Sequence, residues 1–297
     1  MNYCFGVDIG GTTVKIGLFE EMGTIVEKWE IPTNTLADGE AILPDIAFSL
    51  KTKIEERKLS EEDILGIGVG VPAPVTAEGI VNGSANLGWK YKEVKKEMEE
   101  LTGLKAYIGN DANVAALGEM WKGGGAGEKN MIMVTLGTGV GGGVIIDGKM
   151  LVGNNGAGGE IGHICVNYEE NDRCGCGNKG CLEQYASATG IVRLAEQKLK
   201  TEKRETILNK AAITAKDVFD AVKAGDEVAD EIAAEFGKYL GYGLANLAAV
   251  VNPAVFVIGG GVSKAGEVLI PYIEKPYKER ALSLIHISEP TRHAQIS

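Results

Sequence analysis

The sequence predicts an α/β protein with two domains, and three observations carry this prediction. Short apolar runs alternate with segments of helix length along most of the chain, which is typical of α/β folds. Both halves open on a hairpin with a glycine-rich turn, at residues 3–19 and 131–146, which indicates a duplicated architecture. The 297 residues are also enough for two domains that each bury a core.

The first half follows this alternation in order. A helix near its end leads toward consecutive glycines, so we place the domain boundary at residue 117. The expected elements are strands at 3–8, at 14–19 and after Gly23, a helix at 41–57, a strand at 64–71 and a helix at 112–121.

The second half repeats the pattern with longer helices. Apolar residues recur every three or four positions between Ile232 and Val251, which predicts a long helix that Pro253 ends. The predicted domains are a small one at 1–117 and a large one at 118–282, while the tail at 283–297 has no helical period and is expected to lie outside the fold. The other expected elements are a strand at 131–136, a glycine turn at 137–143, a strand at 144–146, a glycine- and cysteine-rich loop region at 153–180 and a strand at 254–258 that leads through glycines into a further helix.

Composition excludes several classes of partner. The chain has 30 Lys and Arg against 41 Asp and Glu, a formal net charge of −11, which disfavours nucleic acid and anionic membranes. No apolar run is long enough to cross a bilayer. The first residues lack the pattern of a secretory signal, so we expect a cytoplasmic location, where a reducing environment favours metal binding by cysteines over disulfides.

Three glycine-rich turns are compatible with phosphate binding through backbone N–H groups. The first, 10–13, follows Asp8 and precedes Lys15, and its alternative interpretation is an ordinary hairpin turn. The second, 137–142, matches G-x-G-x-x-G but continues as a hairpin instead of opening a helix, which disfavours a dinucleotide site and a dehydrogenase. The third, 259–261, joins a strand to a helix. Together they resemble an ATP site, although the chain has no P-loop motif.

Asp111 lies at the start of the predicted helix 112–121 and has two possible roles. Aspartate is a common N-cap, whose loss costs about 1 kcal/mol of stability. A general base is the second role, whose loss costs roughly 10²–10⁴ in rate. One residue can serve both.

His163, Cys174, Cys176 and Cys181 offer one imidazole and three thiolates within a short stretch. This set is sufficient for a tetrahedral structural zinc site. Glu160 and Glu183 flank it, and Asn86 lies in a separate polar loop. Carboxylates and amides bind sugar hydroxyls well, but isolated polar residues of this kind are usually solvated surface.

Taken together, the motifs resemble the ROK family of bacterial sugar kinases, over residues 3–282. The loop 86–89 is most similar to the branch of the family that phosphorylates glucose. The segments that carry the resemblance are 8–12, 109–113, 136–143, 160–163 and 174–183.

The resemblance implies a two-domain ribonuclease H-like fold of the actin and hexokinase type, with an interdomain cleft and a structural zinc loop. It implies ATP-dependent phosphorylation of the 6-hydroxyl of a hexose, with glucose as the first candidate, Asp111 as the base and Mg²⁺ bound with ATP. A homodimer is expected, because dimers are common in the family. The implied sugar-binding residues are Asn86, Asn110, Asp111, Glu160, His163 and Glu183. The implied ATP-binding residues are Asp8, Gly10, Gly11, Thr12, Thr13, Lys15, Gly137, Thr138, Gly139, Gly259, Gly260 and Gly261, and the zinc ligands are His163, Cys174, Cys176 and Cys181.

Several alternatives stay open. Fructose, allose or N-acetylmannosamine can replace glucose as the substrate, and polyphosphate can replace ATP as the donor. A sugar-sensing repressor of the same family would bind sugar without catalysis. Such repressors carry a helix-turn-helix domain before the first glycine turn, and here that turn begins within ten residues of Met1, which favours an enzyme.

Overall fold

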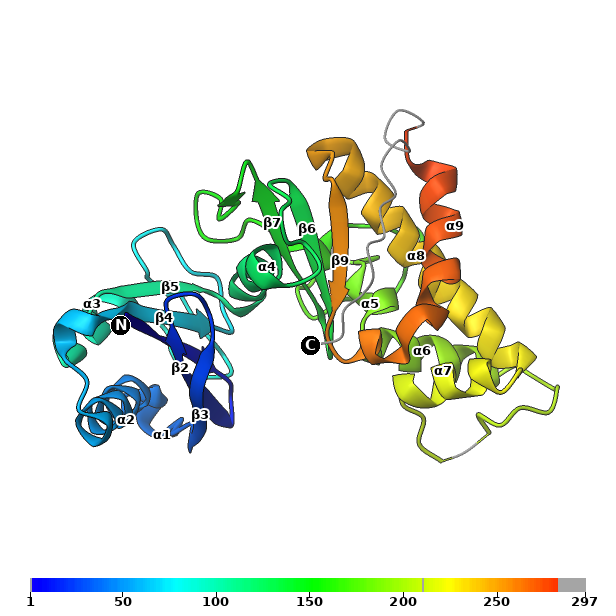
Figure 1. Cartoon of the computed structure of the whole chain (residues 1–297). Helices are drawn as coiled ribbons and strands as arrows, with labels where there is room; N and C mark the ends of the chain where they lie inside the picture. Colours follow the sequence, from blue (N-terminus) through cyan, green and yellow to red (C-terminus); the bar gives the residue numbers. More distant parts are fainter. Residues whose placement is uncertain (1, 210, 283–297) are drawn as a thin grey trace. The chain divides into compact units, whose positions relative to one another are not determined.

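The computed structural model describes residues 2–209 and 211–282, which form two compact units (Figure 1). The first unit takes in the described residues of Met1–Val114 together with Val152–Gly158. The second takes in those of Ala115–Leu151 and Gly159–Ser297. The tail predicted at 283–297 lies outside the described residues.

The first unit is built on a five-stranded sheet with the order β3-β2-β1-β4-β5. The β1 strand pairs antiparallel with β2 and parallel with β4, and β4 pairs parallel with β5. The carboxyl ends of β1, β4 and β5 therefore meet at one edge of the sheet. The strands are β1 (Tyr3–Ile9), β2 (Thr13–Glu20), β3 (Ile25–Pro32), β4 (Ile64–Val71) and β5 (Ala106–Asn110).

Two helices supply the apolar core of this unit. Leu43 and Ile46 of α2 and Met98 of α3 are fully buried in one cluster with Phe5 and Val69 of the sheet. The predicted helix at 41–57 and strand at 64–71 are confirmed. The helical segments are α1 (Leu36–Gly39), α2 (Ile42–Arg57), η1 (Glu61–Asp63), α3 (Val94–Thr102) and α4 (Asp111–Lys122), which begins directly after β5 and runs on into the second unit.

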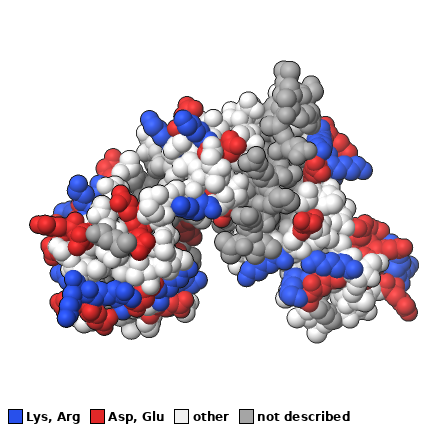
Figure 2. Space-filling model, viewed as in Figure 1, with Lys and Arg blue, Asp and Glu red and all other residues white. Residues whose placement is uncertain are grey.

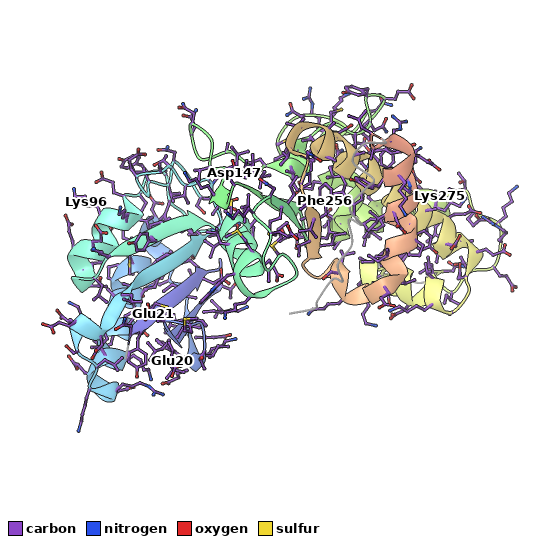
Figure 3. The ribbon with its side chains drawn as sticks, turned by 45° about the horizontal axis from the view of Figure 1, so that its top comes forward. Glu20, Glu21, Lys96, Asp147, Phe256 and Lys275 are labelled. Atoms are coloured by element: carbon purple, nitrogen blue, oxygen red, sulfur yellow. The ribbon has the colours of Figure 1, made fainter. Side chains whose placement is uncertain are left out.

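The second unit has a four-stranded sheet with the order β8-β7-β6-β9. One face packs on the helices that follow it: Phe256 of β9, labelled in Figure 3, meets Tyr277 of α9 edge to face, with ring centroids 5.8 Å apart. The other face contributes Met131 and Val257 to a smaller cluster with Ala116 of α4. The elements are β6 (Met131–Leu136), β7 (Val140–Ile146), β8 (Lys149–Met150), η2 (Ile161–His163), α5 (Glu183–Ala186), α6 (Ala188–Leu199), α7 (Ala215–Lys223), α8 (Glu227–Val251), β9 (Val255–Gly259), η3 (Val262–Leu269) and α9 (Ile270–Arg280).

The long helix predicted before Pro253 is confirmed as α8. The carboxylate of Asp226 accepts hydrogen bonds from the first N–H groups, those of Val228 and Ala229, and so caps the helix. Asn252 ends the helix in the left-handed conformation, with a φ of 48°.

The glycine turn predicted at 137–143 is wrong in its second half. The strand β7 begins at Val140, and Gly142 pairs with Val134 of β6. A Cβ at Gly142 would lie 2.4 Å from Cδ1 of Ile161 and 2.9 Å from the carbonyl oxygen of Gly159. Glycine at this position lets the segment 159–161 pack closely against β7, and it does not form a turn.

The described surface agrees with the mixed charge of the sequence. On the face drawn in Figure 2, acidic and basic side chains are interspersed over both units. Among the described residues, no helix has the length and apolar character needed to span a membrane.

The packing of α8 against α9 predicts an unusual response to alanine. A Cβ at Gly237 of α8 would lie 2.2 Å from the carbonyl oxygen of Tyr272, whereas one at Gly118 of α4 would meet nothing within 4 Å. Gly118→Ala should therefore stabilise the protein by about 0.5–1 kcal/mol, as expected for a helix. Gly237→Ala should destabilise it by about 1–3 kcal/mol. Chemical denaturation measures both, and equal stabilisation by the two variants would contradict the close packing.

Candidate functional site

The parallel strands of the first unit bring two of the predicted carboxylates close to one another. Asp8 is in register with Gly70 of β4, and Gly70 is in register with Gly109 of β5. A Cβ at Gly70 would lie 3.8 Å from Oδ1 of Asp8 and 3.7 Å from Cα of Asp111. Both residues therefore lie beside Gly70 at ordinary contact distance.

Asn110 caps α4, so one of the two roles left open for Asp111 is already filled. Oδ1 of Asn110 accepts hydrogen bonds from the N–H groups of Ala112 at 3.0 Å and Asn113 at 3.2 Å. Its Nδ2 donates to the carbonyl oxygen of Ala73 at 3.3 Å, which fixes the amide. Asp111 is the first residue of the helix, and its Oδ1 accepts from the N–H of Ala112 at 2.8 Å. Its carboxylate is therefore available for a role other than capping.

The environment of Asp111 raises its pKa above the ordinary value for aspartate. Burial by the surrounding protein is the largest cause, even though part of the side chain stays exposed, and the nearby charge of Asp8 acts in the same direction. The hydrogen bond from Ala112 opposes them. A carboxylate with a raised pKa is a better proton acceptor than a free aspartate.

The first glycine turn lies beside the loop that carries Asn86. The N–H of Gly10 donates to the carbonyl of Thr13 at 3.0 Å and closes the turn. A Cβ at Gly11 would lie 3.5 Å from the carbonyl oxygen of Asn86. Asn86 is exposed, while Trp89 of the same loop is buried and donates its indole N–H to a backbone carbonyl at 3.1 Å. The first unit therefore brings this turn and Asn86 together.

Lys15 lies within β2, in agreement with the strand predicted at 14–19. Its partners in the ladder are Asp8 on β1 and Glu30 on β3, so the ammonium group has acidic neighbours on both sides. The three side chains line a hollow of about 490 Å³ on this face of the sheet. A phosphate contact from Lys15 stays a prediction.

The two glycine loops of the second unit are neighbours. Gly260 has a φ of 88°, and a Cβ there would lie 2.6 Å from the carbonyl oxygen of Leu136. Both the backbone angle and the close approach require glycine. Because Leu136 directly precedes Gly137, the loops 137–139 and 259–261 lie side by side.

A cavity of about 320 Å³ opens beside Gly261. Ala188, one of its lining residues, donates its N–H to the carbonyl of Gly137 at 2.8 Å, so the cavity adjoins both glycine loops. The remaining lining residues form no motif that a sequence pattern could reveal, because they come from α7, its N-cap and η3. They are Thr214, Ala215, Lys216, Phe219, Asp220, Lys223, Val262, Lys264 and Ala265.

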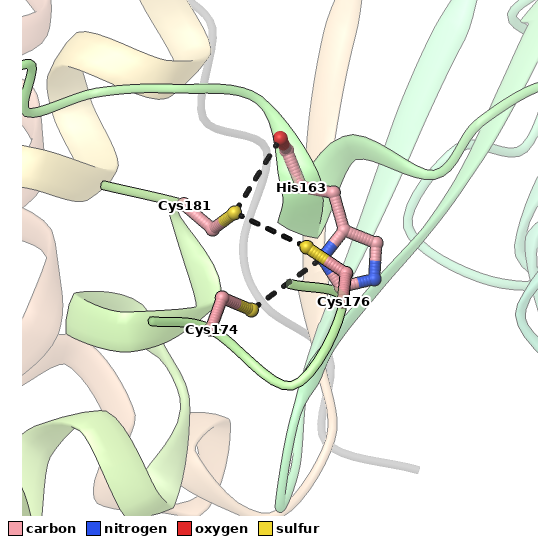
Figure 4. A group of neighbouring side chains, drawn as sticks. All are labelled: His163, Cys174, Cys176 and Cys181. Carbon is pink, nitrogen blue, oxygen red and sulfur yellow. Dashed lines mark hydrogen bonds between the residues drawn. The ribbon is translucent and has the colours of Figure 1, made fainter. Parts of the chain in front are cut away.

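The four predicted zinc ligands come together in the second unit (Figure 4). Their ligand atoms all lie within 4.8 Å of one another, with Cys176 and Cys181 sulfurs 3.6 Å apart and Nδ1 of His163 3.8 Å from the sulfur of Cys174. Zn–S bonds of about 2.3 Å place the sulfurs of a tetrahedral site roughly 3.8 Å apart. Burial raises the pKa of Cys181 to about 12, so its thiolate needs a nearby cation. The donor set and spacing fit Zn²⁺.

Glu183 links this cluster to the second glycine loop. Its Oε2 accepts from the N–H of Val140 at 3.0 Å, and its Oε1 lies 3.6 Å from the sulfur of Cys174. A Cβ at Gly139 would lie 2.2 Å from Oε2, so the loop approaches closely only because that residue is glycine. Glu160 is exposed at the start of η2, and its carbonyl accepts from the N–H of His163 at 3.2 Å.

Two α/β units with glycine turns, a carboxylate at a helix start and a cluster of three cysteines and one histidine define a narrow class of proteins. A sequence profile of the ROK family matches residues 4–294, and the chain belongs to this family.

Curated and solved relatives agree with this assignment. The glucokinase of Halalkalibacterium halodurans is 46% identical over 283 residues, which cover 93% of this chain and 86% of that protein. A glucokinase of Streptomyces coelicolor is 37% identical, covering 94% of this chain and 88% of that protein. The crystal structure of a ROK family glucokinase from Streptomyces griseus in complex with glucose and AMPPNP has a TM-score of 0.75 and 34% identity, covering 99% of this chain and 93% of that one.

The raised pKa of Asp111 predicts a pH-dependent stability. A raised folded-state pKa gives stability that is fully present below the unfolded pKa of about 3.9 and lost as the pH rises through the folded pKa. Asp111→Asn removes the ionisable group and with it this loss of stability. The variant should therefore melt at a higher temperature than wild type at pH 7, and the difference in melting temperature should become smaller toward pH 4. Thermal unfolding at a series of pH values measures it.

The matched control is Asp147→Asn in the exposed turn labelled in Figure 3. Asp147 has a φ of 50°, a conformation that asparagine also adopts, so this variant reports the effect of an Asp→Asn exchange away from the proposed site. A lower melting temperature for Asp111→Asn than for wild type at pH 7 would contradict a pKa of Asp111 that is raised by burial.

Proposed function

We propose that the chain is an ATP-dependent hexokinase that transfers the γ-phosphoryl group of ATP to the 6-hydroxyl of glucose. The observation that carries this proposal is the carboxylate of Asp111, which has a raised pKa while Asn110 caps the helix. The names of the similar proteins support it, since the relative at 46% identity is a glucokinase and the Streptomyces griseus structure holds glucose and AMPPNP.

In the proposed reaction, the carboxylate of Asp111 accepts the proton of the 6-hydroxyl as that oxygen attacks the γ-phosphorus. The bond from the γ-phosphorus to the bridging oxygen breaks, and ADP leaves. The resulting neutral carboxyl is favoured by the same burial that raises its pKa. The proposed sugar ligands are Asn86, Asn110, Glu160, His163 and Glu183. The four carboxylate and amide side chains offer oxygens that accept hydrogen bonds from sugar hydroxyls, and His163 offers a ring nitrogen.

We assign the phosphates of ATP to backbone N–H groups of the three glycine loops, 10–13, 137–139 and 259–261. The N–H groups of Gly10 and Gly137 close their own turns, so the proposed donors are other N–H groups of these loops. The cavity of about 320 Å³ beside Gly261 suits the adenine ring, because Phe219, Val262 and Ala265 give it apolar walls. Mg²⁺ bound with ATP supplies positive charge to the phosphates, and Asp8 is the proposed residue that holds it through water.

We also propose that His163, Cys174, Cys176 and Cys181 bind one structural Zn²⁺. Four protein ligands leave no open coordination position, which is the property of a structural site. Nδ1 of His163 faces the sulfur of Cys174, so the other ring nitrogen, Nε2, stays free for a sugar hydroxyl.

Loss of the base should lower the rate with little change in fold. Asp111→Ala is expected to reduce kcat by about 10²–10⁴ while the KM for glucose changes much less. The assay follows product formation with glucose, fructose, allose and N-acetylmannosamine, using ATP or polyphosphate as the donor, and glucose with ATP should give the highest kcat/KM. Absence of turnover with every sugar and donor would contradict an enzyme and favour a sugar-sensing role.

Metal analysis tests the zinc proposal. Purified protein should contain about one zinc per chain, lost together with activity on chelation. Cys176→Ser removes a ligand and should lose the metal, while Cys4→Ser, a cysteine of the first unit outside the cluster, should keep it. Full activity of a folded, metal-free preparation would contradict the proposal.

Light scattering of the same samples tests the expected homodimer.

A further inference from the structure

A partly buried carboxylate holds the loop that leads into Cys174. Glu170 is 9% exposed at its side chain, and its Oε2 accepts hydrogen bonds from the hydroxyl of Tyr185 and from Nη2 of Arg193, both at 2.5 Å. Its Oε1 accepts from the N–H of Asp172 at 2.9 Å. One side chain therefore joins the loop to α5 and to α6, and none of these residues is a proposed ligand of metal, sugar or ATP.

The network is charged and well packed. Although burial opposes ionisation, hydrogen bonds from Tyr185, from the N–H of Asp172 and from Arg193 lower the pKa of Glu170 to about 2. Nη2 of Arg193 also donates to Oδ2 of Asp172 at 3.1 Å. The ring of Tyr185 stacks on Tyr239 with centroids 3.9 Å apart, so this ring has support beyond its hydroxyl.

Gln184 connects the network to a second cysteine of the cluster. Its Nε2 donates to the carbonyl oxygen of Asp172 at 3.1 Å, and its Oε1 accepts from the N–H of Cys181 at 3.1 Å. The backbone two residues before Cys174 and the backbone of Cys181 are thus held by one continuous set of hydrogen bonds. Both ends of the cysteine loop are restrained by groups outside the cluster.

We propose that Glu170, Tyr185 and Arg193 are positioning residues that keep Cys174 and Cys181 at ligand distance and so slow the loss of metal from the cluster. This inference rests on the zinc binding proposed above. A metal leaves a four-ligand site only after its ligands move apart in succession, and a restrained loop makes that movement less frequent. Partners outside the ligand set commonly change metal affinity by about 10–100-fold.

Tyr185→Phe is the sharpest variant, because it removes only a hydroxyl and keeps the stacked ring. Zinc-loaded protein is mixed with excess EDTA, and samples are withdrawn over time to measure the zinc that remains bound. Tyr185→Phe should release zinc about tenfold faster than wild type. Arg193→Met should release it at least as fast, and Arg193→Lys, which retains one charged donor, should restore part of the difference.

Tyr272→Phe is the matched control, because it removes a hydroxyl that donates to Asp230 elsewhere in the same unit. It should release zinc at the wild-type rate, and the metal-free forms of the two Tyr→Phe variants should melt at similar temperatures. Wild-type release rates in both Tyr185→Phe and Arg193→Met would overturn the positioning role while leaving the zinc site intact. A wild-type protein that binds no zinc would overturn both proposals, and activity with glucose is measured separately.

Discussion

The hydrogen bonds from the start of α4 to Asn110 fix the arrangement on which the first unit's proposed chemistry depends. Because the amide satisfies the N–H groups of Ala112 and Asn113, Asp111 enters the helix as its first residue instead of capping it. The parallel strands then bring both Asp111 and Asp8 beside Gly70. The cap and the position of Asp111 follow from the junction between β5 and α4, and the charge of Asp8 on β1 adds to the burial that raises the pKa of Asp111.

In the second unit, two glycines let neighbouring groups approach the proposed phosphate loops more closely than any other residue would allow. Gly139 admits the carboxylate of Glu183, and Gly260 admits the end of β6. Glu183 in turn connects the glycine loop to Cys174, so the proposed phosphate loop and the proposed zinc site share a residue. Through Glu183, a metal held at the proposed zinc site would help to position the glycine loop without taking part in the reaction.

Much of this organisation was predictable from local pattern, and the exceptions have physical causes. Strand and helix alternation, the helix before Pro253 and the cysteine spacing are local signals, and the structure contains each of them. The sequence could not decide whether Asn110 or Asp111 caps α4, because asparagine and aspartate are equally good N-caps. The sequence pattern predicts that Gly142 belongs to a turn. In the structure, glycine is needed there because Ile161 packs against it, and the spacing of residues in the sequence does not reveal this contact. The cavity beside Gly261 combines ordinary side chains from separate elements and carries no motif.

The proposed chemistry depends on Asp111, whose partial burial and raised pKa suit it to accept the proton of the sugar. The most direct test compares two pH dependences of the wild-type protein: the titration of the Asp111 carboxyl followed by carbon-13 NMR, and the acid limb of kcat/KM for glucose. The rate should fall with a pKa equal to that of the carboxyl, and both pKa values should lie above the ordinary aspartate value of about 3.9. A carboxyl that titrates at or below that value, or a rate that stays constant while it titrates, would rule out Asp111 as the base.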